Sequence, residues 1–320
     1  MLIAPSHRSA HLMALGTALF WSLAFVCIRE VLEQLKALGA SPWEATVALF
    51  QARMILTALA YLPHIFINQK QISFLTLDDW KRVCLIILTM SFGYHLPLNM
   101  GAQSLPSGFV GLIVATSPIF AALLARVILQ EALGFARLSA VVLGLVGVGI
   151  CLIAQNRLQF DPLILGWASL RDPALVMFSA FDGALFAIVG RRIRREIPVS
   201  LKLGLAMLGT VLLALPLWTP HILHLLFQIN LRGWFAILYL AIACTYFASL
   251  LWYGALKILE TVEVTLYLNT TTILALAWGA ILFQEQIRPL YGIGVSCVLL
   301  AIFFASRKIP KEIEPPPSVS

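Results

Sequence analysis

The spacing of the charged residues constrains this chain more than any other feature. Its 22 Lys and Arg and 15 Asp and Glu fall almost entirely in short clusters. The clusters are separated by uncharged stretches of about 18 to 24 residues, the length that a helix needs to cross the hydrocarbon core of a bilayer. With 60% hydrophobic and 12% charged residues, the chain is also too apolar for an ordinary soluble domain. The sequence therefore predicts an all-α membrane protein.

Ten uncharged stretches can be separated along the chain. The third and fourth form one run over residues 83–125, which we divide at the Leu-Pro-Ser-Gly turn signal of residues 105–108 because a run of this length is too long for one crossing. The ten predicted membrane-spanning helices are residues 11–28, 43–67, 83–103, 107–129, 135–155, 173–190, 201–219, 233–256, 262–284 and 289–306.

Several of these helices begin at recognisable capping signals. Segments 41–44 and 76–79 have a Ser or Thr three residues before an acidic residue, which is the spacing of a capping box. Asp172 followed by Pro173 predicts a cap for the sixth span. Three tryptophans fall at predicted water interfaces, as membrane aromatic belts do: Trp43, Trp80 and Trp234.

The distribution of cations predicts the orientation in the membrane. With a cytoplasmic amino terminus, 15 Lys and Arg lie on the cytoplasmic side and 6 on the other. This excess predicts a multi-pass protein of the cell (inner) membrane with both termini on the cytoplasmic side. The net charge of +7 is then explained by cations that flank spans, so no nucleic-acid partner is expected. Residues 307–320 contain three consecutive prolines and are predicted to be a disordered cytoplasmic tail.

Neither a cofactor nor a metal is expected. The five cysteines lie within apolar stretches, without a CxxC pair or a histidine at ligand spacing. The chain has no HExxH motif, glycine-rich phosphate loop or nucleophile motif. The sequence therefore does not predict an enzyme.

The chain also contains an internal duplication. The segment LLARVILQEALGFARLSAVVLGLVGVG recurs in outline as ALAWGAILFQEQIRPLYGIGVSCVLLAIF, which aligns Glu131 with Glu285. Small residues at matching positions after each Glu allow helices to approach closely in lipid. These residues are Ala140, Gly147, Gly294 and Ala301.

Five spans in each copy are an odd number, so the second copy must enter the membrane in the opposite direction. We therefore expect two inverted five-helix repeats, residues 1–155 and 156–306. Inverted repeats are typical of secondary transporters, which bind their substrate near the bilayer midplane between the repeats.

Three segments resemble the EamA type of the drug/metabolite transporter superfamily: FWSLAFVCIRE, ATSPIFAALLARVILQEALGFARLSAVVLGLVGVG and LLWYGALKILETVEVTLYLNTTTILALAWGAILFQEQIRPLYGIG. The resemblance covers residues 12–306. It implies ten helices around a central cavity and the export of small organic metabolites. The family often has a proline near the middle of the fourth span of both repeats, whereas here Pro118 is matched by Thr272.

Two ionisable residues lie about mid-span, Arg53 in the second span and Asp182 in the sixth. Charges at this depth are costly, so they normally face a partner or a water-filled space. One interpretation is a mutual salt bridge, and the other is contact with a charged substrate or a coupling proton. A buried carboxylate binds a proton more readily than an exposed one, which makes Asp182 a candidate proton carrier.

The third span carries a polar stripe, with Tyr94 beside it. Ser91, His95, Asn99 and Gln103 recur every four residues and so share one helix face. The stripe either hydrogen-bonds to other helices or lines a cavity, and we favour the cavity because four polar residues exceed what packing needs.

Aromatic residues gather at similar depths in the first, eighth and ninth spans. Tyr239, Tyr246 and Tyr253 recur at intervals of seven, a pattern that is more often core packing than a binding surface. Combining these features, the predicted substrate-binding residues are Trp21, Arg53, Tyr94, His95, Asn99, Asp182, Trp252 and Asn269.

The sequence predicts a carrier that exports a small organic metabolite, with amino acids and related compounds as candidates, by alternating access. The alternatives are a nucleotide-sugar or lipophilic drug transporter, or a membrane receptor or enzyme that moves nothing. No ATP motif is present, so proton coupling or the solute gradient would supply the energy. The sequence does not indicate an oligomeric state.

Overall fold

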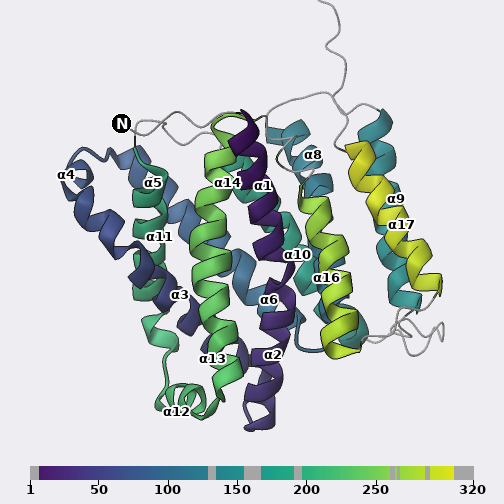
Figure 1. The fold of residues 1–320 in the computed structure, drawn as a ribbon, viewed down its shortest axis with the longest axis horizontal. Coiled ribbons are helices and arrows are strands. Elements are labelled where there is room, and N and C mark those ends of the chain that lie inside the picture. Colours follow the sequence, from purple (N-terminus) through teal and green to yellow (C-terminus); the bar gives the residue numbers. More distant parts are fainter. Residues whose placement is uncertain are drawn as a thin grey trace, which may run out of the picture.

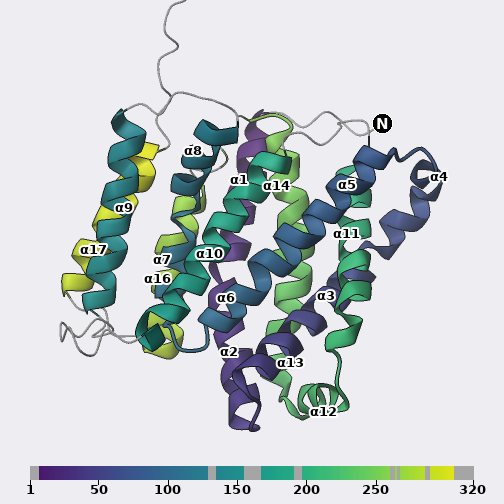
Figure 2. The same ribbon diagram turned by 180° about the vertical axis from the view of Figure 1, so that it is seen from behind.

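The computed structural model describes residues 7–128, 135–154, 167–190, 197–259, 264, 267–284 and 289–305. Over these residues the chain forms a bundle of helices without a strand (Figures 1 and 2). The elements before residue 155 are α1 (His7–Ser22), α2 (Ala24–Ala37), α3 (Pro42–Ile67), α4 (Gln69–Ile72), α5 (Leu77–Ile86), η1 (Ile87–His95), α6 (Leu96–Gly101), α7 (Ser107–Val114), α8 (Ser117–Ile128) and α9 (Phe135–Ala154). Those that follow are α10 (Trp167–Gly190), α11 (Val199–Ala214), η2 (Leu215–Leu217), α12 (Pro220–Gln228), α13 (Leu231–Leu238), η3 (Tyr239–Phe247), α14 (Ala248–Leu256), α16 (Leu268–Phe283) and α17 (Pro289–Ala305).

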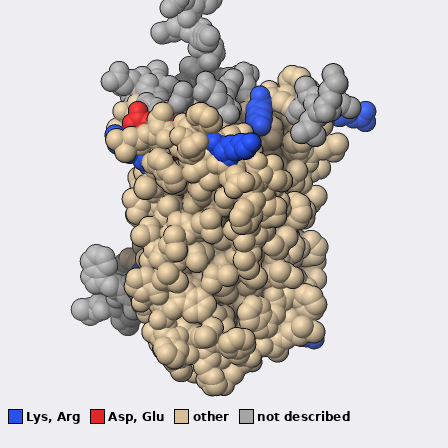
Figure 3. All heavy atoms as spheres, turned by 90° about the vertical axis from the view of Figure 1, so that its left-hand side faces the viewer, with Lys and Arg blue, Asp and Glu red and all other residues tan. Residues whose placement is uncertain are grey.

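Within the described ranges, five helical segments are long and apolar enough to cross a membrane, judged by length and composition. They are His7–Ala37, Pro42–Ile67, Leu77–Gly101, Val199–Leu217 and Leu231–Leu256. Shorter apolar helices lie in α9, α16 and α17. The face in Figure 3 has a broad band without Lys, Arg, Asp or Glu, and the charged residues seen there gather mostly at one end. This distribution suits a protein surrounded by lipid.

Both predicted capping boxes are present. Ser41 accepts a hydrogen bond from the Glu44 backbone N–H, and the Glu44 carboxylate accepts one from Ser41 N. Thr76 and Asp79 make the same reciprocal pair at the start of α5. These caps satisfy backbone donors that a helix start leaves unpaired.

The prediction that Asp172 and Pro173 begin the sixth span is wrong. Helix α10 is already formed at Trp167, and Pro173 lies inside it. A proline removes one intrahelical hydrogen bond, but the turns before it can still be helical. The Asp172 carboxylate instead accepts a hydrogen bond from the Ser104 hydroxyl. This bond joins α10 to the loop that follows α6.

The first span is longer than predicted and is divided. Helix α1 ends at Ser22, and after Leu23 the chain continues as α2 as far as Ala37. The charged residues of α2 therefore lie in the helix and not beyond it. Arg29 Nε and Glu33 Oε1 form an i,i+4 ion pair at 2.6 Å on its partly exposed side, which suits a helix end near water.

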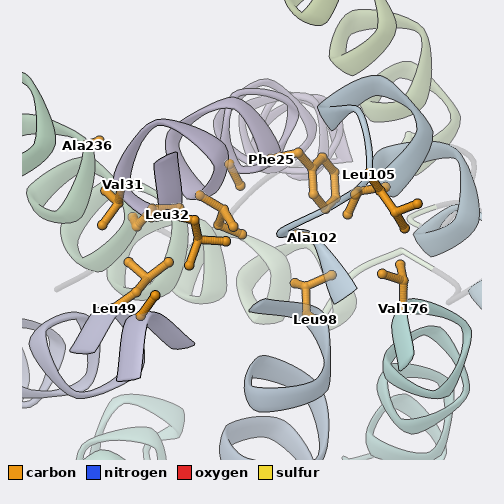
Figure 4. Packing of buried hydrophobic residues seen from close by; sticks show 14 of the residues in the cluster. Phe25, Val31, Leu32, Leu49, Leu98, Ala102, Leu105, Val176 and Ala236 are labelled. Carbon is orange, nitrogen blue, oxygen red and sulfur yellow. The ribbon is translucent and has the colours of Figure 1, made fainter. Parts of the chain in front are cut away.

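Buried apolar side chains join both parts of the chain. In Figure 4, Phe25 and Leu32 of α2, Leu49 of α3, Leu98 of α6 and Val176 of α10 belong to one cluster. Because α10 follows residue 155 and the other helices precede it, the core does not separate the two predicted repeats.

Helices α9 and α17 pack side by side through the small residues that the duplication aligned. A Cβ added at Gly147 would lie 2.8 Å from the Gly294 carbonyl oxygen, and one at Gly144 would lie 3.4 Å from the Ala301 Cβ. The prediction of close helix approach is thus confirmed for Gly147, Gly294 and Ala301. Ala140 lies outside the described side chains, and Glu131 and Glu285 lie outside the described residues.

The apolar segments Leu77–Gly101 and Leu231–Leu256 each contain a nine-residue π-helix, η1 and η3, and these π-helices begin 152 residues apart at Ile87 and Tyr239. A π turn holds one residue more than an α turn and often marks a functional site. Pro97 follows η1 closely. Because a proline ring clashes with the carbonyl four residues earlier, it favours a wider turn there.

Candidate functional site

Arg53 lies at the centre of a buried polar network. Its side chain is 5% exposed. Nε donates a hydrogen bond to Thr245 Oγ1 at 2.8 Å, and Nη1 lies 3.4 Å from His95 Nδ1. Arg53 belongs to α3, His95 to η1 and Thr245 to η3, so the network joins the first and second parts of the chain.

The salt bridge considered for Arg53 and Asp182 is not formed. Among the described residues, no carboxylate lies within ion-pair distance of Arg53. The guanidinium instead contacts a hydroxyl group and an imidazole. A buried charge without a counterion is costly, so an arrangement of this kind indicates a functional role more than a structural one.

Thr245 connects this network to the π turn of η3. Its hydroxyl donates a hydrogen bond to the Leu240 carbonyl, five residues earlier, at 2.8 Å. One turn away, Thr57 of α3 donates to the Ala241 carbonyl at 3.2 Å. Two hydroxyl groups thus join η3 to α3.

Trp21 and Trp252 extend the network toward α1 and α14. Trp21 Nε1 donates to the Cys244 carbonyl at 2.8 Å, next to Thr245. The two indole rings lie 5.4 Å apart between centroids and are tilted by 40°. Trp252 is 8% exposed, whereas Trp21 is half-buried. Two predicted binding residues from distant parts of the sequence therefore meet.

Tyr94 lies on the other side of His95. Their rings are edge to face, with centroids 5.0 Å apart. The structure thus connects five of the eight predicted residues through ring contacts and the backbone and hydroxyl groups of η3: Trp21, Arg53, Tyr94, His95 and Trp252.

Asp182 lies apart from that network. It is 6% exposed, and its Oδ2 has no hydrogen-bond partner. Its carboxylate lies against Gly93 of η1, where an added Cβ would be 2.7 Å from Oδ1. Only a glycine leaves room for the carboxylate at this point. The neighbouring Gly183 lies against Tyr94.

The polar stripe of the third span mostly joins helices. Ser91 accepts a hydrogen bond from Thr210 of α11 at 2.7 Å, and Gln103 donates to Thr46 of α3 at 2.9 Å. His95 meets Arg53 as described, so interhelical bonding accounts for three of the four positions. Asn99 differs, because it is fully buried and its amide nitrogen and oxygen have no partner.

Sequence reasoning missed Thr245, Gly93 and the Cys244 carbonyl. Pro97 was an available signal for the π turn of η1, because prolines disturb the preceding turn of a helix. No comparable signal exists for η3. The predicted Asn269 belongs to α16, but its side chain lies outside the described ones. The described residues contain no cluster of three His, Cys, Asp or Glu that could hold a metal ion.

The sequence profile of the EamA-like transporter family matches the chain twice, over residues 8–153 and 173–307. The chain belongs to the EamA-like transporter family. The two matches correspond to the two copies that the duplication predicted, and the family implies a small-molecule substrate and a multi-pass location in a lipid bilayer.

Similar proteins agree with this membership. An uncharacterized transporter of Archaeoglobus fulgidus is 26% identical over 296 residues, which cover 91% of this chain and 96% of that protein. The uncharacterized transporter YyaM of Bacillus subtilis is 22% identical over 95% of this chain and 96% of its own length. A protein of known crystal structure has the same fold, with a TM-score of 0.59, 18% identity and coverage of 94% of this chain and 97% of that one.

Proposed function

We propose that this protein exports a small organic metabolite across the cell (inner) membrane by alternating access. It would do so with ten membrane-spanning helices arranged as two inverted repeats, residues 1–155 and 156–306. The observation that carries this proposal is the bond from Arg53 Nε to Thr245 Oγ1, at 2.8 Å, because it places a buried charge at the contact between the two repeats. A solute bound there would touch both repeats at once.

The packing of the helices supports the inverted repeat. Helices α3, α7 and α9 pack on α11, α16 and α17, which are their counterparts in the second repeat. Other contacts also occur in matched pairs. Helix α1 packs on α14 while α10 packs on η1 and α6, and α1 packs on α16 while α10 packs on α7 and α8. Exchanging the repeats leaves this set of contacts unchanged, as a two-fold axis between the repeats requires. With an odd number of spans in each repeat, we expect that axis to lie in the membrane plane.

Contacts at both ends of the bundle join the same two repeats. Toward the end that holds the N terminus (Figure 1), His11 Nδ1 of α1 lies 3.1 Å from the Tyr267 hydroxyl. At the opposite end, Gln34 Nε2 donates to Asn230 Oδ1 at 3.0 Å, and His221 lies 3.6 Å from Glu44. Opening one end at a time would expose the centre to each side of the membrane in turn.

The charge pattern supports the proposed orientation. In the face of Figure 3, most Lys and Arg lie at the end of the bundle that also holds the N terminus. Cytoplasmic ends of membrane proteins carry such an excess of cations. Both termini would therefore be cytoplasmic. Asp182 would be the proton carrier if transport is coupled to protons, because its Oδ2 has no partner.

A flux assay tests the proposal. Proteoliposomes that contain the purified protein are loaded with a labelled metabolite extract. The rate of release is compared with that from vesicles containing the Arg53→Gln variant and from vesicles without protein. We expect release from wild-type vesicles alone. Binding or conversion without release would instead indicate a receptor or an enzyme, and release of nucleotide sugars or lipophilic drugs alone would identify another substrate class.

Cysteine labelling tests the topology separately. Single cysteines at Lys70 and Lys257 should react with an impermeant reagent only after the membrane is opened. Labelling of these two positions from opposite faces of the membrane would contradict the inverted repeat.

A further inference from the structure

The Arg53 guanidinium is charged but is held only by neutral groups. Its partners are the Thr245 hydroxyl and His95 Nδ1, which can accept a hydrogen bond only when that nitrogen carries no proton. Within the described part of the chain, Nη2 has no hydrogen-bond partner. A guanidinium has five N–H donors and pairs best with a carboxylate through two parallel hydrogen bonds. The site therefore lacks an anion.

Asp182 does not supply that anion. Its carboxylate lies against Gly93, whereas Arg53 meets His95, two residues further along η1. Residues two apart project to nearly opposite sides of a helix. The third span therefore separates the two charges, and the missing anion must come from elsewhere.

Thr245 determines how the guanidinium is presented. Its hydroxyl has one donor, which is used on the Leu240 carbonyl of the π turn, so its oxygen accepts from Arg53 Nε. Thr245 is 2% exposed, so water does not replace it easily. With Nε bound to Thr245 and Nη1 near His95, the guanidinium plane is fixed, and within the described residues Nη2 remains without a hydrogen-bond partner.

We propose that the exported solute carries a carboxylate that binds Arg53, and that Thr245 is the positioning residue that aims the guanidinium at it. This inference rests on the proposed transport function and gives it a substrate class. The aromatic rings of Trp21 and Trp252 lie beside the same turn of η3, through the Cys244 carbonyl. They provide an apolar surface for the rest of the solute.

The experiment compares acids with their amides. Probes are labelled L-phenylalanine, L-leucine, phenylacetate and hexanoate, each with its carboxamide, which keeps the shape and removes the charge. Flux is measured in proteoliposomes, and binding is measured by tryptophan fluorescence. We expect at least one acid to bind about tenfold more tightly, and to be transported about tenfold faster, than its amide. A factor of this size corresponds to the usual contribution of a hydrogen bond to a charged group.

Four variants separate positioning from packing. Thr245→Val should raise the half-saturating concentration of the acid about tenfold while leaving the maximal rate and amide binding unchanged. Thr245→Ser keeps the hydroxyl and should restore wild-type values. Arg53→Gln should remove the preference for acids. Thr210→Val breaks a hydroxyl contact between α11 and η1 and is the matched control, with no expected change in acid preference.

Two results would overturn the inference. One is the absence of any acid that binds or moves in preference to its amide. The other is a Thr245→Val variant that weakens acid and amide equally, which would make Thr245 a packing residue. Acid-specific binding without flux would instead leave the carboxylate site intact and contradict the proposed transport function.

Discussion

The two π-helices lie at corresponding places of the two proposed repeats but accommodate different charged groups. Gly93 and Thr245 are each the seventh residue of their segment. At Gly93 the missing side chain admits the carboxylate of Asp182, and at Thr245 the hydroxyl receives the guanidinium of Arg53. One backbone geometry thus accommodates opposite charges, and the difference lies in a single side chain at the same position.

The two segments also differ in what widens the helix. In η1, Pro97 lies close behind the π turn and disturbs the carbonyl of Gly93, four residues earlier. In η3 the Thr245 hydroxyl bonds the Leu240 carbonyl. A proline ring thus follows the first π turn, whereas a side-chain hydrogen bond, which can break, spans the second. The second is therefore the one that a ligand on Arg53 can change.

The largest expected effect comes from filling the space at Gly93. Gly93→Ala places a Cβ 2.7 Å from Asp182 Oδ1, and overpacking of this kind costs about 1–3 kcal/mol. We expect a lower thermal unfolding temperature and lost transport. Gly149→Ala is the control, because an added Cβ there has nothing within 4 Å. If the Gly93→Ala, Asp182→Ala double variant regains the wild-type unfolding temperature, the contact between the two residues is confirmed. If Gly93→Ala alone unfolds at the wild-type temperature, the contact is refuted.

The next largest effect concerns the charge beside η1. Asp182→Asn keeps the shape and removes the charge and the exchangeable proton. If Asp182 carries a coupled proton, flux driven by a pH gradient should fall about tenfold or more, while solute-driven exchange persists. Both rates are measured in the same proteoliposomes. An unchanged response to the pH gradient would eliminate Asp182 as the carrier.

A smaller effect is expected beside η3. Trp21→Phe retains an aromatic ring against Trp252 but removes the 2.8 Å hydrogen bond to the Cys244 carbonyl. The expected loss is about 1 kcal/mol of stability, with weaker solute binding. The loss of stability is measured by thermal unfolding in detergent. The control variant is Trp43→Phe, because Trp43 is 49% exposed. Equal behaviour of the two variants would mean that the Trp21 hydrogen bond adds nothing.

The smallest effect is expected on the polar stripe of η1. Ser91→Ala removes the 2.7 Å contact with Thr210, and such bonds between membrane helices average about 0.6 kcal/mol. Since Pro97 and not Ser91 holds this π turn, solute affinity should stay at the wild-type value. A loss of affinity as large as that of Thr245→Val would mean that the two π turns act alike.

Much of the fold could be predicted from local features of the sequence. Both capping boxes, the turn near Pro106 and the close approach at Gly147 and Gly294 depend on residues near one another or on a repeated pattern. The error at Pro173 arose because a proline inside a helix and one at its start look the same in the sequence. The twofold match to the family agrees with the duplication.

The site was predicted only in part, for a physical reason. Helical periodicity tells which side chains share a face, but it does not say which helix that face meets. It could place Arg53 and Asp182 at mid-span, yet it could not decide whether they pair. The pairing of Arg53 with Thr245, 192 positions away, depends on how η3 packs against α3.

The sequence alone therefore determined an apolar, helical and duplicated chain, because lipid requires long uncharged helices whatever their neighbours are. Only the tertiary structure decided that Gly93 would admit one charge and Thr245 would hold the other. Those contacts depend on how η1 packs against α10 and how η3 packs against α3. The residue at the seventh position of each π-helix, Gly93 or Thr245, determines which partner fits.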